Sequence, residues 1–141
     1  ELAASLPAPD EWAYLGGGGC RTLFPLGDGL DYSRHLHHFE SEEDQGKPYD
    51  MEQANLFGLS IAYDPYKREL VDGKTLTTCG GDGGCNVCGG MGPLLGYLPC
   101  SPHCKPEVRE DNEIHNDYDF FRPVIRVQTS GWRIVSPENE R

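Results

Sequence analysis

The sequence has no hydrophobic run that approaches the roughly 20 residues of a membrane-spanning helix. It also has no cluster of Lys and Arg, because 23 acidic residues face only 12 basic ones and the net charge is −11. Nucleic-acid and anionic membrane surfaces are bound through basic patches, so we expect neither. An acidic surface favours solubility and docking to a protein partner with a basic surface, or to a multi-subunit complex.

Motifs of catalytic and nucleotide-binding sites are also lacking. There is no G-x-S-x-G nucleophile turn, no H-E-x-x-H zinc helix, no phosphate-binding G-x-x-x-x-G-K and no dinucleotide G-x-G-x-x-G after a strand. His35, His37 and His38 stand near Glu42, and His35 and His38 would share one face of a helix. A histidine cluster beside acids is more typical of a solvated surface than of a metal site. We therefore predict no catalytic residues and no enzymatic activity.

Hydrophobic residues make up only 37% of the chain, below the roughly 45–50% of an average globular protein. Gly and Pro together contribute 29 of the 141 residues, from 18 Gly and 11 Pro. This composition predicts one small domain over residues 1–141 that is mainly β with long irregular loops, with α+β as the alternative class. A loop-rich fold of this kind needs covalent or metal cross-links to offset chain entropy.

Two β-hairpins are expected. The alternation of Leu59, Ile61 and Tyr63 with small residues predicts a strand, and residues 68–71 and 74–77 read as a hairpin closed by a two-residue Asp72-Gly73 turn. The second hairpin joins residues 124–128 to 132–135.

The remaining segments are less regular. Residues 1–30 read as an extended Pro/Gly-rich arm, and residues 105–119 as a polar surface loop. A short helix is expected over residues 33–44, capped by Ser33, and another helical turn over residues 52–57.

Cysteines carry the strongest signal in the chain. They fall at positions 20, 79, 85, 88, 100 and 104, so five of the six lie within residues 79–104. That segment is rich in glycine and proline and poor in large apolar side chains, so burial alone cannot fold it. Its sulfurs must hold a metal, a cluster or one another.

The run Cys79-Gly-Gly-Asp-Gly-Gly-Cys85-Asn-Val-Cys88 has the spacing C-x5-C-x2-C. It resembles the cluster-binding loop of 2Fe–2S ferredoxins, in which C-G-G-x-G-x-C-x-x-C recurs. The resemblance implies a 2Fe–2S cluster held by Cys79, Cys85 and Cys88, with Cys100 as the fourth ligand. Glycines let the backbone approach such a cluster closely, and the preceding hairpin would match the first hairpin of the ferredoxin fold.

Two other interpretations stay open. Cys85, Cys88, Cys100 and Cys104 form two ligand pairs suited to a structural zinc ion, with His103 as a substitute ligand. The stretch Cys85-Asn-Val-Cys88-Gly-Gly-Met-Gly also resembles one element of the zinc finger of J-protein co-chaperones. Alternatively, the even number of cysteines fits three disulfides, with Cys20 and Cys104 as candidates outside the cluster set.

These readings lead to two functional hypotheses. The first is a ferredoxin-like iron–sulfur protein, or a relic of one, that carries electrons or serves as a subunit of a larger organellar complex. The second is a non-enzymatic accessory or secreted interaction protein stabilised by disulfides or by structural zinc. The first residue is Glu1 rather than Met, which indicates a removed presequence or a fragment. Removal would place the chain in a plastid or mitochondrion, or on the secretory route.

Overall fold

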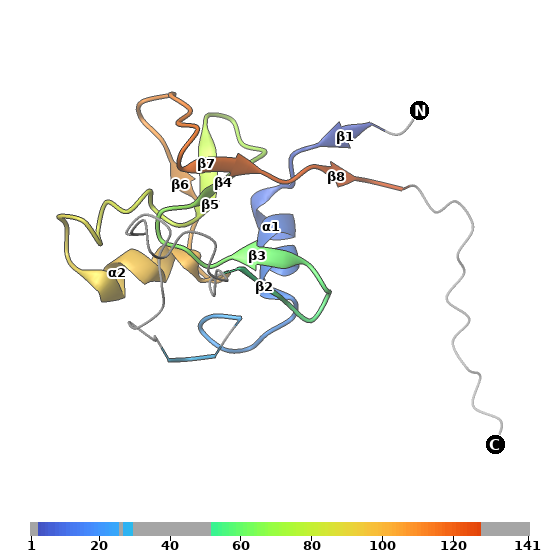
Figure 1. Ribbon diagram of the computed structural model, residues 1–141. Helices are drawn as coiled ribbons and strands as arrows, with labels where there is room; N and C mark the ends of the chain where they lie inside the picture. Colours follow the sequence, from blue (N-terminus) through green and yellow to red (C-terminus); the bar gives the residue numbers. More distant parts are fainter. Residues whose placement is uncertain (1–2, 26, 30–51, 128–141) are drawn as a thin grey trace, which may run out of the picture.

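Short strands joined by long loops dominate the computed structural model, which describes residues 3–25, 27–29 and 52–127 (Figure 1). Two α-helices accompany the strands in this part of the chain. The mainly β, loop-rich single domain predicted from composition is therefore confirmed. The expected helix over residues 33–44, with His35, His37 and His38, lies outside the described residues. None of the described helices is long and apolar enough to cross a membrane.

The central sheet has four strands in the order β6-β5-β4-β7. Strands β4 (Arg68–Val71) and β5 (Thr77–Gly80) form the predicted hairpin, and β6 (Glu107–Val108) extends it on one side. On the other side β7 (Asp119–Phe121) runs parallel to β4. Every residue of β5 is buried, and the strand leads directly into the glycine-rich cysteine loop.

The turn of this hairpin is longer than predicted. Val71 pairs with Thr77, so residues 72–76 form the connection instead of Asp72-Gly73 alone. Within this connection the backbone amide of Asp72 donates to the carbonyl oxygen of Pro7 at 2.8 Å, which ties the turn to the N-terminal segment.

Two short ribbons complete the strands. The predicted strand around Ile61 is confirmed as β3 (Ser60–Ala62), but it pairs with β2 (Glu52–Ala54), where we expected a helical turn. That prediction was wrong because a tight turn, in which the Gly58 amide donates to the Asn55 carbonyl at 2.9 Å, folds the two strands together. Strand β8 (Val124–Ile125) pairs with β1 (Ala4–Ser5). Its predicted partner, residues 132–135, lies outside the described residues.

The N-terminal segment is not simply an extended arm, because helix α1 (Pro9–Gly17) forms within it. Pro9 occupies the first helical position, where a missing N–H costs nothing. Glu11 accepts a hydrogen bond from the Ala8 amide at 2.8 Å, and Gly18, at φ +58°, ends the helix in a left-handed conformation. The run of glycines at positions 16–19 argued against a helix in the sequence. Pro9 at its start and Gly18 at its end are nevertheless typical helix-end signals.

Two hydrophobic clusters form the core. The larger contains Phe24, Ile61, Tyr63, Tyr66, Tyr97 and Cys100. It brings β3 together with helix α2 (Pro93–Tyr97) and the 3-10 helix η2 (Leu98–Cys100). The smaller contains Trp12, Val71 and Cys79 and seats α1 against the β4–β5 hairpin. The buried Trp12 indole also donates to Glu69 at 2.7 Å, so α1 is fixed by both packing and hydrogen bonding.

A buried cluster of ion pairs links the segment that follows β6 with β4 and β7. The carboxylate of Asp119, whose side chain is fully buried, accepts from Arg68 Nε at 2.8 Å and from Arg109 at 3.0 Å. It also accepts from the His115 amide at 2.8 Å. Asp119 was predicted to end a polar surface loop, and its burial with two arginines corrects that prediction.

Candidate functional site

The glycine-rich loop that follows β5 lies on the turn formed by residues 64–67. The amide of Gly81 donates to the Lys67 carbonyl at 2.6 Å, and those of Asp82 and Gly84 donate to the Pro65 carbonyl at 2.9 and 3.0 Å. These bonds engage three backbone amides of the loop. The loop is thus held on one side by a second stretch of the same chain.

This close approach explains why glycines recur in the loop. A Cβ added at Gly81 would lie 2.3 Å from the Pro65 carbonyl oxygen, a distance that side chains do not reach. Gly84, at φ +80°, faces the Tyr66 ring, and an added Cβ would lie 2.0 Å from a ring carbon. Gly81 and Gly84 therefore let the loop lie directly against the backbone of residues 64 and 65 and the ring of Tyr66.

Asp82 begins a tight turn that carries two of the cysteines. Its Oδ2 accepts from the Asn86 amide at 3.2 Å and from the Asn86 side chain at 2.8 Å, and the Cys88 amide donates to the Gly84 carbonyl at 2.9 Å. Cys85 and Cys88 are both exposed. The sulfur of Cys88 lies 2.7 Å from the Tyr66 hydroxyl oxygen, and burial, followed by this hydrogen bond, raises the pKa of Tyr66.

The other two predicted cluster ligands are buried in separate parts of the core. Cys79 packs with Trp12 in the smaller hydrophobic cluster, whereas Cys100 packs with Phe24 and Tyr97 in the larger one. Burial, then the negative charges of Glu69 and Cys104, raises the pKa of Cys79 to about 12. Burial likewise raises the pKa of Cys100 well above its ordinary value. Both sulfurs are therefore protonated at neutral pH in this arrangement.

The two disulfide candidates lie near each other in the fold. Cys104 is exposed on a turn after η2, where its amide donates to the Ser101 carbonyl at 3.0 Å. Cys20 is half-buried, and the segment that follows it reaches the same turn through a contact of 3.1 Å between the Thr22 carbonyl and His103 Nε2. All six cysteines are free thiols in this structure.

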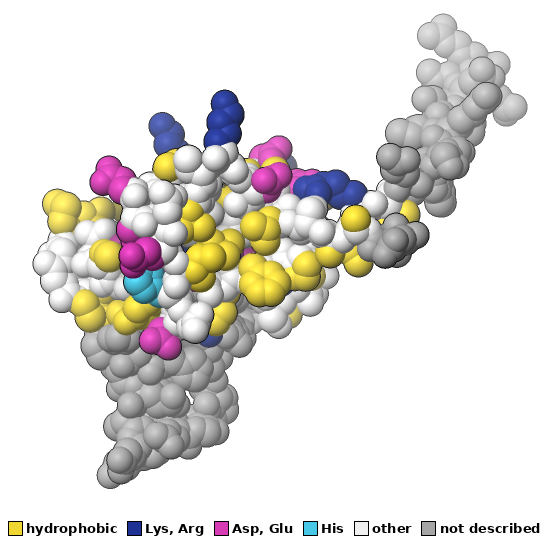
Figure 2. Space-filling model, turned by 90° about the horizontal axis from the view of Figure 1, so that it is seen from above, with side chains coloured by type: hydrophobic (Ala, Val, Ile, Leu, Met, Phe, Trp, Pro, Cys, Tyr) yellow, Lys and Arg dark blue, Asp and Glu magenta, His cyan; other side chains and the backbone are white. Residues whose placement is uncertain are grey.

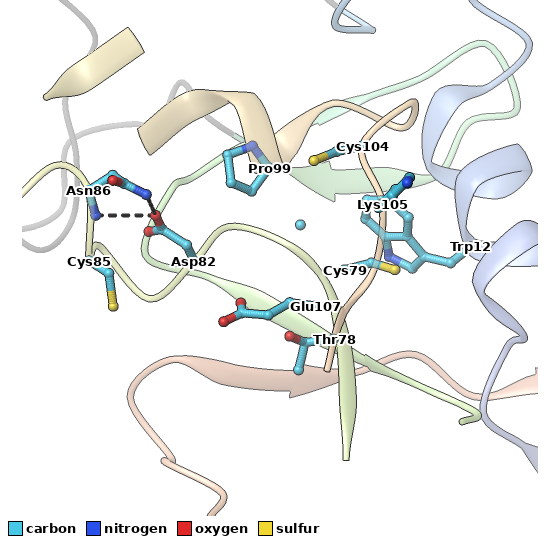
Figure 3. Close-up of a pocket in the computed structure, with 11 residues that line it drawn as sticks. Trp12, Thr78, Cys79, Asp82, Cys85, Asn86, Pro99, Cys104, Lys105 and Glu107 are labelled. Carbon is cyan, nitrogen blue, oxygen red and sulfur yellow. Dashed lines mark hydrogen bonds between the residues drawn. The ribbon is translucent and has the colours of Figure 1, made fainter. Parts of the chain in front are cut away.

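A cavity of about 290 Å³ brings three of the thiols to one place (Figure 3). Cys79, Cys85 and Cys104 line it, together with Trp12 and the carboxylate residues Asp82 and Glu107. Two buried oxygens of lining residues, Thr78 Oγ1 and Asp82 Oδ1, lack a hydrogen-bond partner among the described residues. A cavity with such walls suits water or another hydrogen-bond donor.

The predicted metal sets do not converge on this cavity. Cys88 and Cys100, which belong to both the cluster set and the zinc set, are not among its lining residues. Within residues 3–25, 27–29 and 52–127, no group of three or more His, Cys, Asp or Glu side chains is placed to hold a metal ion. The thiols in this arrangement therefore fit neither a shared four-thiolate cluster nor a tetrahedral zinc site.

Sequence reasoning did not single out Tyr66, which packs against the loop and contacts Cys88. The Asp64-Pro65 pair before it indicates a turn, yet no local pattern says that residues 80–84 lie on this turn. Trp12 is both buried and part of the cavity wall.

We expect iodoacetamide to label Cys85, Cys88 and Cys104 in the folded, reduced chain well before Cys79 and Cys100. The thiolate is the reactive form, so labelling of Cys79 should accelerate as pH rises toward about 12. The unfolded chain loses this proton nearer the ordinary value of 9.0, so the stability that Cys79 contributes is complete below 9.0 and is lost as pH rises through about 12. A time course of labelling by mass spectrometry at several pH values measures this order. Equal rates at Cys79 and Cys85 in the folded chain would contradict the burial of Cys79.

No protein-family model, no curated protein and no solved structure matches this chain.

Proposed function

We propose that this protein is a non-enzymatic accessory or interaction domain whose cysteine-rich segment, residues 79–104, is braced by disulfides. The observation that carries this proposal is the distribution of the sulfurs. Two are buried in different hydrophobic clusters, while Cys85, Cys88 and Cys104 are exposed around a cavity and its neighbouring turn. Sulfurs spread in this way suit pairwise bonds between segments better than one shared centre.

The segment itself supports a bracing role. Only five residues of it form helix α2 and three form η2, and much of the rest is turn and loop. Disulfides stabilise such chains mainly by restricting the unfolded state. Because disulfides persist in oxidising compartments, the proposal implies a secreted or otherwise oxidising location.

Surface chemistry supports a protein partner. Exposed hydrophobic side chains follow the chain through β7 and β8, where Phe121, Ile125 and Val127 are 68%, 53% and 67% exposed. Hydrophobic atoms gather along one face in Figure 2. Four arginines are already engaged with carboxylates, namely Arg68, Arg109, Arg122 and Arg126. With a net charge of −11, the partner we propose is a protein with a basic rim around an apolar contact area.

Iron–sulfur electron transfer stays a prediction from the loop sequence. It would require Cys79 and Cys100 to leave their clusters and meet Cys85 and Cys88, with the Cys88 contact to Tyr66 broken. Two glycines of the pattern that carried the ferredoxin resemblance, Gly81 and Gly84, contact residues 64–66. Disulfide bracing needs no such rearrangement of the core as a whole.

The two functions are separated by the purified protein, produced in an oxidising host. We expect a colourless sample without stoichiometric iron or zinc, whose intact mass rises by two hydrogen atoms per disulfide on reduction. Reductant should make residues 79–104 sensitive to protease, while a metal chelator should leave their resistance unchanged. A brown sample with visible absorbance, or stoichiometric zinc lost together with protease resistance on chelation, would overturn the proposal.

A further inference from the structure

We propose that Cys79 and Cys104 form a disulfide across the cavity between β5 and the turn that follows η2. This inference rests on the proposed function and deepens it, because it names the bond that braces the segment. It commits to one of the 15 pairings that six cysteines allow.

The first support is the placement of the two side chains. Cys79 lies in β5 and Cys104 on the turn closed by the Ser101 carbonyl, and both line the same cavity. Strand β5 and η2 pack against each other, so the two residues are carried by neighbouring elements. In Figure 3 Cys79 lies beside Trp12 and Cys104 lies between Pro99 and Lys105, both in the half of the cavity away from Cys85.

The second support is electrostatic. The charge of Cys104 contributes to the raised pKa of Cys79, as it does to that of Cys100, whereas no contribution to Cys79 comes from Cys85. Figure 3 agrees, because Cys85 lies at the opposite end of the cavity beside Asn86. Of the two other thiols on the cavity wall, Cys104 is therefore the nearer partner.

The remaining cysteines are engaged elsewhere. Cys88 contacts Tyr66 and does not line the cavity. Cys100 is buried in the aromatic cluster and does not line the cavity. The sulfur of Cys20 lies beside Pro102 of the Cys104 turn at the position of Gly17, but it contacts the Thr22 carbonyl at 3.8 Å and does not line the cavity.

The bond forms by thiol–disulfide exchange with a low-molecular-weight disulfide, RSSR. The exposed Cys104 thiolate attacks one sulfur of RSSR, giving a mixed disulfide at Cys104 and releasing RS⁻, which takes up the proton that Cys104 lost. Cys79 then gives up its proton and attacks the Cys104 sulfur, releasing a second RSH. Two protein thiols are oxidised to one disulfide, and one small disulfide is reduced to two thiols.

Closing this bond has a structural consequence. Because Cys104 lies on an exposed turn and Cys79 in the middle of the sheet, the turn is the part that moves. The bond draws the turn onto β5 and ties the glycine-rich loop, α2 and η2 into one closed loop. It also consumes Cys79, so the oxidised chain no longer has the first ligand of the predicted 2Fe–2S set.

The test is to map the bond in the reduced 141-residue chain after exposure to oxidised glutathione. Cleavage before Asp82 and after Met91 separates Cys79 from Cys85 and Cys88, and these from Cys100 and Cys104. Fragmentation between Ser101 and Pro102 in the mass spectrometer then distinguishes Cys100 from Cys104. We expect a linked pair that joins the Cys79 fragment to Cys104 and is lighter by two hydrogen atoms than the reduced fragments.

Two variants give a matched comparison. Cys104→Ser removes the partner and should leave Cys79 free, whereas Cys88→Ser alters another exposed thiol, outside the cavity, and should keep the bond. If Cys104→Ser fails to fold, the mapping in the unmodified chain still decides the pairing. Linkage of Cys79 to Cys85, or of Cys104 to Cys20 or Cys100, overturns this inference but leaves disulfide bracing intact. A chain that forms no internal disulfide, or that holds iron or zinc, overturns both.

Discussion

Replacing Asp119 by Ala is expected to lower the free energy of unfolding by about 3–5 kcal/mol, because the change removes the buried carboxylate that two buried arginines share. The carboxylate side chain has no exposed surface and accepts hydrogen bonds from both Arg68 and Arg109, as well as from the His115 amide. Removing one partner of a buried ion pair leaves an uncompensated charge in the interior. Small domains have only about 5–15 kcal/mol of stability, so this loss is a large share of the total.

Urea unfolding followed by circular dichroism, in the same redox state for each variant, measures the effect. Asp111→Ala is the matched control, since Asp111 pairs with the same Arg109 but its side chain is 47% exposed. Water replaces the lost partner there, so the midpoint should move far less. Equal shifts for the two variants would show that the Asp119 cluster does not hold β7 and the 109–115 segment to the sheet.

The burial of Asp119 could not be predicted from the sequence. This residue ends a polar, acidic stretch, and nothing local distinguishes it from Asp111 or Asp117. Its burial depends on Arg68, fifty-one positions away in the chain, and on the parallel pairing of β4 with β7. The strand around Ile61 and the β4–β5 hairpin, apart from the length of its turn, were predictable because their signals are local.

In the cysteine-rich segment, too, some features follow from local sequence and others depend on remote contacts. The sequence predicted that residues 79–104 need a cross-link and that the loop glycines permit a close approach, and the structure agrees that the loop is closely approached. What approaches it is the turn at residues 64–66, which no spacing rule identifies. Which thiols share a cavity likewise depends on how β5 packs against η2, so the pairing of Cys79 with Cys104 could not be read from spacing.

The second large expected effect is the loss of stability on replacing Gly81. Gly81→Ala should destabilise the metal-free chain by about 1–3 kcal/mol, the usual cost of forcing an extra methyl group into a packed region. The added Cβ would lie 2.3 Å from the Pro65 carbonyl oxygen and 2.5 Å from that of Asp64. Both atoms belong to the backbone, so no side-chain rotation relieves the contact, and the loop or the turn must move.

Gly89→Ala is the matched control, because an added Cβ at Gly89 meets no atom within 4 Å. Its unfolding free energy should change by no more than about 0.5 kcal/mol. The comparison also tests the origin of the glycine pattern. If Gly81 serves only to bring backbone near a cluster, Gly81→Ala should be tolerated in the metal-free chain as well as Gly89→Ala is. If Gly81 serves to place the loop against Pro65, Gly81→Ala should lower the unfolding free energy even in the metal-free chain. The sensitivity of residues 79–88 to protease should then rise as well.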